Sequence, residues 1–346
     1  MKVIGARSPY TIEINEANQI GSKLEIFIWH KGETEPTTPT HTLSKSISSI
    51  ADRKNIYNIS QYILENIKTT SPTYVTAPAI ESNDVWCFVK VKKYKLIGST
   101  YTLVDTTNFI GVDGYTNYMG GANNLITDQT RFPLYNNLLT YSYATNYGYF
   151  NILIEGDAEF PLNVVYTGVS DIDIFMTAGE VYNYKIPFVS SGTFAPSIVL
   201  TQEDTFLTLK VEQICEPKYT PIVCSFINRF GGWEFLTFFK ANQQSIEVKS
   251  SDLKLMSDSW DYNPLVGTTK SFNFNGMQKI TCNTGFIDEN KFQLIQDLLV
   301  SQTILLDNVP VICKTKSVDY KTRLKDRNIN YTIGFEYNFN LINDAI

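Results

Sequence analysis

The stretch from Cys224 to Lys240, CSFINRFGGWEFLTFFK, constrains the fold of this chain more than any other part of the sequence. Two runs of about strand length, rich in β-branched and aromatic residues, flank a break that contains Gly231 and Gly232. Glycine adopts positive φ angles without a steric cost, so this break is typical of a hairpin turn. Apolar residues occupy both parities of each run, which indicates strands covered on two faces. We therefore expect a central hairpin and not an exposed sheet edge.

Length and composition set the size of the fold and the kind of surface. The 346 residues predict two or three domains, and the 43% of hydrophobic residues suffice for packed cores. Only 18% of the residues are charged, below the usual level of about a quarter, so Asn, Thr, Ser and Tyr must supply much of the polar surface. The 21 tyrosines suit packing against other proteins, because Tyr offers a large contact area at a low rotamer cost. The net charge of −6 argues against nucleic acid as a partner.

The five cysteines show no metal-ligand spacing. Cys87, Cys224 and Cys313 lie in apolar strand patterns, where cysteine acts as a small buried hydrophobe. Cys215 and Cys224 flank a short turn, and a disulfide across it is an alternative to free thiols. The pattern is otherwise typical of a protein that folds in a reducing cytosol. We see no apolar segment of a secretory signal, and no apolar run approaches the roughly 20 residues of a membrane span.

Residues 1–104 contain short alternating runs separated by turn residues, which is typical of a β-sandwich. A short helix is expected from Gln61 to Ile67. A strand is expected from Val85 to Val91, and a run of lysines interrupts this strand-like segment. We interpret these lysines as a solvated strand edge that discourages pairing with other sheet edges. They are Lys90, Lys92, Lys93 and Lys95.

Residues 105–149 break this pattern, because Gly, Asn and Tyr dominate and the segment is too long for a routine connection. We interpret it as an ordered, aromatic-rich insertion that provides a contact surface. The alternative is a strand-and-loop excursion that packs on its own domain. The candidate interface residues here are Tyr115, Tyr118, Tyr147 and Tyr149.

The remaining chain predicts a second β unit at residues 150–217 and a C-terminal α+β domain at residues 218–346. The fold class is thus mainly β, with two N-terminal β-sandwich-like units followed by an antiparallel sheet with one helix. The helix is expected from Asp288 to Ser301, with apolar residues on one face and Asp288 as the N-cap. Strict alternation from Ile329 to Phe339 predicts a strand with one dry and one wet face.

Two turns carry further predictions for the C-terminal domain. A second hairpin is expected to turn near Asn275 and Gly276, because Asn-Gly favours tight hairpin turns. Phe230 and Trp233 lie beside the glycines of the first hairpin and could stack on a sugar or a base. Aromatic residues at a hairpin tip more often pack on a neighbouring domain or subunit. Both therefore join the candidate interface residues, as does Trp260 in the loop Ser257 to Thr268.

A search for catalytic chemistry finds no recognisable arrangement. His30 and His41 are the only histidines, and the sequence has no G-x-S-x-G, no phosphate-binding loop and no H-E-x-x-H. Asp171 and Asp173 alternate with isoleucines, so we interpret them as the wet face of a strand and not as catalytic carboxylates or calcium ligands. We predict a non-enzymatic protein with no catalytic, cofactor-binding or metal-binding residues.

Three blocks of sequence carry a family resemblance. The first comprises ARSPYTIEI, KLEIFIWHKG, PTHTLSK and YNISQYI, and the second is EPKYTPIVCSFINRFGGWEFLTFFK. The third comprises ITCNTGFIDENKFQLIQDLLVSQTILL and VPVICKTKSVDYKTRLKDRNINYTIGFEYNFN. In this order the blocks resemble virion structural proteins of tailed bacteriophages that infect Bacteroidetes, and they cover most of the chain outside 105–195. The resemblance implies a tail, baseplate or ring component, with no catalytic residue to transfer.

Our favoured hypothesis is a non-enzymatic structural subunit of a tailed bacteriophage virion, in the tail, baseplate or neck ring. Its partners would be other copies of itself and other virion proteins, and it would be made and assembled in the host cytoplasm. The alternative is a receptor- or carbohydrate-binding virion module that uses exposed Tyr and Trp. A hydrolase of surface polysaccharide is a third hypothesis and requires a carboxylate pair in a cleft.

Overall fold

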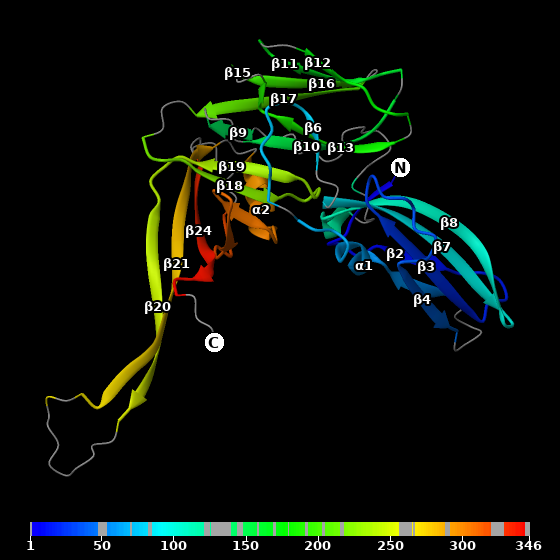
Figure 1. Ribbon diagram of the computed structural model, residues 1–346, viewed down its shortest axis with the longest axis horizontal. Coiled ribbons are helices and arrows are strands. Elements are labelled where there is room, and N and C mark those ends of the chain that lie inside the picture. The colour runs from blue at the N-terminus through cyan, green and yellow to red at the C-terminus, as the bar shows by residue number, and fades with distance from the viewer. Residues whose placement is uncertain are drawn as a thin grey trace.

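Three β-rich units surround a common junction, and Figure 1 shows them as separate lobes. This computed structural model describes residues 2–47, 54–69, 71–81, 85–120, 125, 140–143, 148–157, 159–168, 171–178, 180–190, 193–202, 205–214, 218–255, 265, 267–287, 291–319 and 329–342. The predicted fold class, mainly β with a helix in the C-terminal region, is confirmed.

The N-terminal unit packs a five-stranded sheet against a two-stranded sheet and a short helix. The larger sheet has the order β1-β8-β7-β3-β4, and the smaller one pairs β2 with β5. Apolar residues of both sheets and of the helix form one core that includes Ile26, Tyr57 and Val89. The elements are β1 (Lys2–Gly5), β2 (Thr11–Ile14), β3 (Gly21–Trp29), β4 (His41–Ser46), β5 (Asn55–Asn58), α1 (Ser60–Leu64), β7 (Trp86–Ile97) and β8 (Thr100–Val112).

The interpretation of the lysine run as a strand edge is wrong, because β7 is the central strand of its sheet. Three of the lysines reach acidic side chains elsewhere: Lys90 pairs with Glu35, Lys93 with Asp105 and Lys95 with Glu16. The fourth, Lys92, lies over the ring of Phe27 on the adjacent strand. Long lysine stems can cover a sheet face while their ammonium groups stay in water, so a central strand accommodates them.

The middle unit is a sandwich of two sheets, with orders β10-β13-β6 and β12-β11-β16-β17-β9, and a small β14–β15 pair. Residues of both sheets form its core, such as Ile152, Val164 and Leu200. Its strands are β6 (Ala79–Ile80), β9 (Thr140–Tyr143), β10 (Tyr149–Glu155), β11 (Leu162–Tyr166), β12 (Asp171–Ile174), β13 (Val181–Pro187), β14 (Val189–Ser190), β15 (Thr193–Phe194), β16 (Ser197–Gln202) and β17 (Thr205–Ile214).

Two elements lie across the domain bounds expected from the sequence. Strand β8 crosses the expected bound between residues 104 and 105 and continues to Val112, so the start of the expected insertion is a strand of the N-terminal sheet. Strand β6 comes from the expected first domain but pairs with β13 of the middle unit. The chain therefore passes between the first two units more than once.

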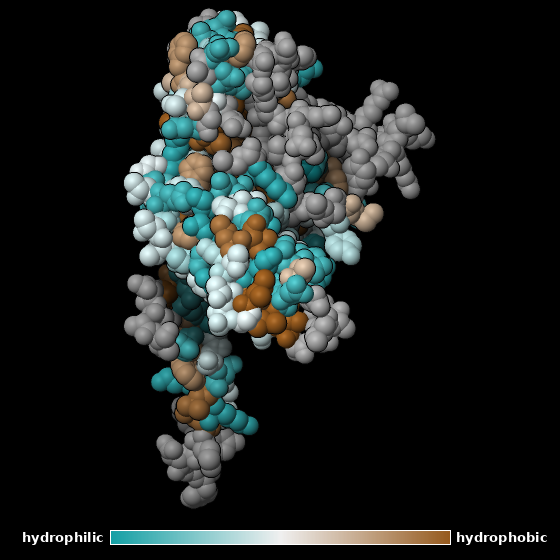
Figure 2. Space-filling model, turned by 90° about the vertical axis from the view of Figure 1, so that its right-hand side faces the viewer, coloured by the Kyte–Doolittle hydropathy of each residue, from teal (hydrophilic) through white to brown (hydrophobic). Residues whose placement is uncertain are grey.

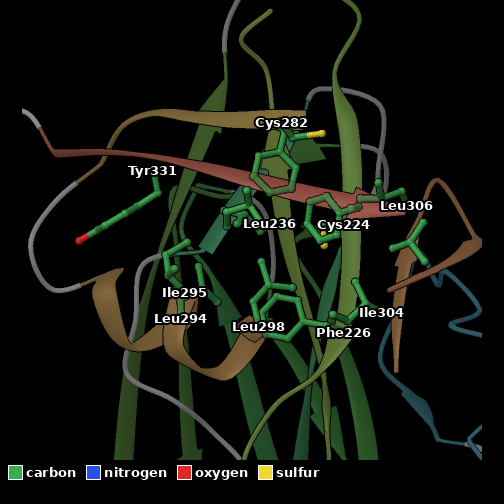
Figure 3. Close-up of a cluster of buried hydrophobic side chains, with 14 of the residues drawn as sticks. Cys224, Phe226, Leu236, Cys282, Leu294, Ile295, Leu298, Ile304, Leu306 and Tyr331 are labelled. Carbon is green, nitrogen blue, oxygen red and sulfur yellow. The ribbon is translucent and has the colours of Figure 1, made fainter. Parts of the chain in front are cut away.

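The C-terminal unit is a seven-stranded antiparallel sheet, β19-β18-β22-β23-β24-β21-β20, with one helix on its face. Leu294, Ile295 and Leu298 of this helix point into the core that β18, β19 and β24 line (Figure 3). The elements are β18 (Ile222–Ile227), β19 (Trp233–Phe238), β20 (Gln243–Lys254), β21 (Thr269–Ile287), α2 (Phe292–Val300), β22 (Ile304–Leu306), β23 (Val309–Cys313) and β24 (Ile329–Asn340).

The hairpin predicted at the start of this unit is confirmed as β18 and β19, whose last facing residues are Ile227 and Trp233. All six residues of β19 are buried although β19 is the last strand of the sheet, because strands of the middle unit pack on it. The predicted helix is also confirmed as α2. Lys291 occupies the N-cap position, and Asp288 lies outside the described residues. Cys224 is a free, buried thiol, so the alternative of a disulfide with Cys215 is wrong.

The predicted turn near Asn275 and Gly276 is wrong, because β21 runs through both residues and stays paired with β20. One residue of β20 faces two of β21 here, which makes a β-bulge, and Asn273 adopts the left-handed conformation (φ 55°). The Asn275 side-chain oxygen accepts from the backbone N–H of Gly276 (2.8 Å) and of Ile342 (3.2 Å). Asn275 therefore joins β21 to the end of β24 instead of closing a hairpin.

Strands β20 and β21 continue beyond the body of the sheet as a two-stranded ribbon, which we call the arm (Figure 1). The last residue of β24 in register with β21 is Asn340, opposite Met277, so the outer part of β21 pairs with β20 alone. The arm projects away from all three units. None of the described helices is long and apolar enough to cross a membrane.

Candidate functional site

The tip of the β18–β19 hairpin, residues 228–232, lies where the three units meet, and we call this region the junction. Asn228 shapes the turn: its side-chain oxygen accepts from the backbone N–H of Phe230 (3.0 Å) and of Gly232 (3.1 Å). Gly231 has a φ of 82°, and a Cβ there would lie 3.0 Å from the backbone nitrogen of Asp113. The turn is therefore close to the N-terminal unit at a position that favours glycine.

The N-terminal unit holds the tip through Arg7 and Tyr115. The Arg7 guanidinium pairs with the Asp113 carboxylate (3.1 Å) and donates to the backbone oxygen of Asn228 (3.1 Å). It also lies over the ring of Tyr115, 5.0 Å from its centroid. The backbone N–H of Tyr115 donates to the backbone oxygen of Arg229 (2.8 Å). One arginine thus links the first and third units, and its side chain is only 6% exposed.

The middle unit holds the tip through Asn151 on β10. Its side-chain oxygen accepts from the backbone N–H of Trp233 (3.1 Å). Its side-chain nitrogen donates to Glu81 (2.9 Å) and to the side-chain oxygen of Asn183 (3.2 Å). Glu81 in turn pairs with the buried Lys185 (3.1 Å). Asn151 therefore joins the third unit to a buried ion pair of the second.

Helix α2 closes the junction from the C-terminal unit. Asp297 accepts from the Tyr115 hydroxyl (3.0 Å), which comes from the N-terminal unit, and from the backbone N–H of Arg229 (3.5 Å). With the Gln293 amide oriented so that its oxygen faces Arg229, this oxygen accepts from the Arg229 guanidinium (3.0 Å). The Arg229 side chain therefore contacts α2 of its own unit, and its guanidinium lies over the ring of Phe230.

Three buried carboxyl groups surround this tip, and burial raises the pKa of each. Desolvation raises the pKa of Glu234 to about 7, although Asn228 donates to its carboxylate (2.9 Å) and Arg229 opposes the shift. Desolvation likewise raises the pKa of Asp113 against Arg7, and of Asp297 against Tyr115 and Arg229. Two guanidinium groups thus lie among three carboxyl groups whose charged forms burial disfavours.

The charged groups of the junction make contacts between the units. Its arginines and carboxylates contact one another or the backbone of a neighbouring unit. Among the described residues, no three His, Cys, Asp or Glu side chains are grouped as metal ligands. Asp171 and Asp173 lie exposed on β12, and Asp173 accepts from Asn163 on β11 (2.8 Å), which confirms the wet strand face expected for them.

The structure divides the predicted interface residues into two groups. Trp233 is 3% exposed and Tyr149 is 1% exposed, and both pack in one buried cluster with Phe235. Phe230 packs on the cluster between the first and second units, and Tyr115 reaches Asp297. These four make contacts within one chain. Tyr118, in a short 3-10 turn (Tyr118–Gly120), is 96% exposed, whereas Tyr147 and Trp260 lie outside the described residues.

The arm offers apolar side chains outward. All twelve residues of β20 are exposed, including Ile246 (58%) and Val248 (61%). Pairing places these two on the same face as Gly276 and Phe274, whereas the bulge moves Phe272 to the other face, beside Leu253. Figure 2 shows hydrophobic side chains among hydrophilic ones where the arm projects below the body. An alternation of apolar residues in β20, SIEVK, is the signal that could have identified this surface.

Comparison with family models finds no match for this chain, and comparison with curated protein sequences finds none either.

Proposed function

We propose that this protein is a non-enzymatic structural subunit of a tailed bacteriophage virion, in the tail, baseplate or neck ring. It acts by assembly with other copies of itself and with other virion proteins, and it is made and assembled in the host cytoplasm. Support comes from the three sequence blocks that resemble such proteins and from the arm. The arm is the observation that carries the proposal.

A projecting two-stranded arm gains little stability in a monomer. An isolated two-stranded ribbon is marginally stable in water, and an exposed strand edge invites pairing with another chain. The arm keeps Ile246, Val248 and Phe274 about half exposed or more, so a monomer gains little from burying them. A partner that covers these side chains removes apolar surface from water at about 25 cal/mol per Å². The arm is thus suited to contact another subunit.

The junction supports the same function, because repeated assembly requires subunits of one shape. Contacts from Arg7, Asn151 and Asp297 hold the hairpin tip against residues of all three units. These contacts fix the direction in which the arm leaves the body. A fixed direction lets one contact repeat with the same geometry around a ring or along a tube.

Mass spectrometry of purified phage particles tests the proposal. We expect the chain in washed particles at a constant ratio to the other virion proteins, across independent preparations. Lysate from which the particles have been removed is the control, because a non-structural protein remains there. Absence of the chain from particles that are otherwise complete contradicts the proposal.

A receptor- or carbohydrate-binding virion module is the second candidate, and one feature favours it. Tyr219 and Phe286, 42% and 61% exposed, border a shallow pocket whose lining includes Asn283 and Asn330. Exposed aromatic rings beside amide groups suit the apolar and polar faces of a sugar. Binding to a glycan array that Phe286→Ala abolishes, together with weaker adsorption of phage to the host, would favour this function. Unchanged adsorption of the variant phage counts against it.

A further inference from the structure

We propose that the free edge of β20 pairs antiparallel with the same edge of a second copy of this chain, with Val248 at the centre of the pair. This inference rests on the proposed function and names one of the contacts through which the subunits assemble. Its basis is the position of β20, the pattern of its charges and the apolar strip beside it.

Within the part of the chain that the structure describes, β20 is the last strand of its sheet and is paired on one side, with β21. Its twelve residues contain no proline, so the outward backbone groups can accept a further strand along the whole element. The β-bulge lies in β21 and leaves β20 regular. A long, regular edge is the geometry that allows another strand to be added.

Symmetry limits the possible registers. A twofold axis that relates two antiparallel edge strands runs perpendicular to the sheet, so one residue of β20 must lie opposite its own copy. With Val248 at the centre, residue 248 + n faces residue 248 − n, and residues 243–253 of the two copies overlap. Glu247 of each copy then faces Lys249 of the other, which gives two pairs of opposite charge.

Placing the twofold axis at another residue of β20 gives a less favourable register. A centre at Glu247, Lys249 or Asp252 places two identical charges directly opposite each other, which is destabilising. A centre at Ser250 or Ser251 places Lys254 opposite an apolar side chain, Ile246 or Val248 respectively. A centre nearer either end of the strand shortens the overlap of the described residues. The charge pattern and the length of the overlap together select Val248.

The register centred on Val248 also brings apolar side chains of the two copies together. Ile246 and Val248 lie on the face of β20 that continues the core face of the sheet, with Phe274 on β21 beside them. In the pair, the two Val248 side chains face each other and each Ile246 is diagonal to the Val248 of the other copy. Cross-strand apolar neighbours of this kind stabilise antiparallel sheets. The exposed apolar side chains of the two copies thereby form one continuous surface.

Cysteine cross-linking tests the register on the full chain. Val248→Cys is expected to form a disulfide-linked dimer under mild oxidation, because facing Cα atoms of antiparallel strands lie about 4.5–5.5 Å apart. Ser250→Cys is the matched control: it faces residue 246, so its own copy is roughly 13 Å away along the strand. The unsubstituted chain, with its five cysteines, gives the baseline. Equal dimer from both variants, or none from Val248→Cys, overturns the proposal.

Exchange of charges tests the pairing without a covalent bond. Glu247→Lys and Lys249→Glu each replace two attractive pairs by two repulsive ones. The affinity of each variant for itself should therefore fall by up to about tenfold. A mixture of the two restores opposite charges at both pairs, and its association should return to near the parent level. Glu247 also pairs with Lys279 within the chain, so the recovery on mixing is the decisive result. Failure of the mixture to recover overturns the proposal.

The two proposals fail separately. If Val248→Cys gives no dimer but the chain is present in particles, the β20 pairing is wrong and the structural role stands. If Val248→Cys cross-links in solution but the chain is absent from particles, the pairing stands and the virion role is wrong.

Discussion

Arg7 shows how single buried charges hold the junction together. Its guanidinium contacts the Asp113 carboxylate, the Asn228 backbone oxygen and the Tyr115 ring. The partners are far away in the sequence: Asp113 is 106 positions from Arg7, and Asn228 is 221 positions from it. No local pattern marks such a residue, so the sequence allowed no prediction of its role.

Arg7→Ala should lower the free energy of unfolding by about 3–5 kcal/mol, because it leaves the buried Asp113 carboxylate without its cation. Chemical denaturation followed by tryptophan fluorescence measures this change. Lys54→Ala is the matched control, since it removes an exposed ion pair with Glu13 and should cost no more than about 1 kcal/mol. Equal costs for the two variants contradict the proposed role of Arg7.

Glu234 makes the stability of the protein depend on pH. Its pKa is raised from 4.5 to about 7 in the folded chain, so between these values the folded protein keeps a proton that the unfolded chain releases. The contribution of Glu234 to the free energy of unfolding is greatest below pH 4.5. It decreases as the pH rises to about 7 and is constant above that pH. Glu234→Gln should therefore stabilise the protein by about 3 kcal/mol at pH 8 and by little at pH 4.5. Unfolding curves of parent and variant that differ by the same amount at both pH values contradict this.

Among the helices and strands, those whose formation depends on their own residue pattern could be predicted from the sequence. Helix α2 has an apolar face that recurs along one turn after another, and β24 alternates strictly, so both could be identified from the sequence. The turn predicted near Asn275 and Gly276 is wrong, because the contacts of Asn275 with the end of β24 outweigh the turn preference of the pair. The lysine-bearing strand β7 was misplaced for a similar reason, since strand order in a sheet depends on partners distant in sequence.

The β18–β19 turn gives a prediction at this scale. Gly231→Ala should cost more than Gly98→Ala, although both glycines have positive φ (82° and 61°). A Cβ at Gly98 has open space around it and adds only the strain of the left-handed region, about 1–2 kcal/mol. A Cβ at Gly231 also lies 3.0 Å from the backbone nitrogen of Asp113, so it pushes the first and third units apart. Thermal unfolding of the two variants measures the difference, and equal shifts contradict a tight contact at the turn.

At the scale of the whole molecule, the body and the arm are separable. The three cores and the junction lie in the body, whereas the arm holds mostly exposed side chains. The mainly β composition could be predicted from alternating runs and turn residues, whereas the bounds between the units could not, because β6 and β8 lie across the expected ones. The arm could not be predicted, because its bulge and its register depend on how β20 and β21 pair.

Removal of the arm should leave the body intact. Ile246 and Gln278 face each other, so residues 247–277 can be replaced by a two-residue Asn-Gly turn. We expect the free energy of unfolding to fall by only about 1–3 kcal/mol, because most of the removed side chains are exposed and the main loss is that of the hydrogen bonds from residues 275–276 to residues 341–342. Incorporation of the shortened chain into particles should be lost. A shortened chain that is incorporated normally contradicts the role of the arm, and one that unfolds shows that the arm belongs to the body.

A cryo-electron microscopy reconstruction of the particle that contains this chain would show what the arm contacts. We expect the arm of each copy to lie against another subunit, with an additional strand along the β20 edge. A resolved copy whose arm is surrounded by solvent on both edges and both faces would contradict this expectation.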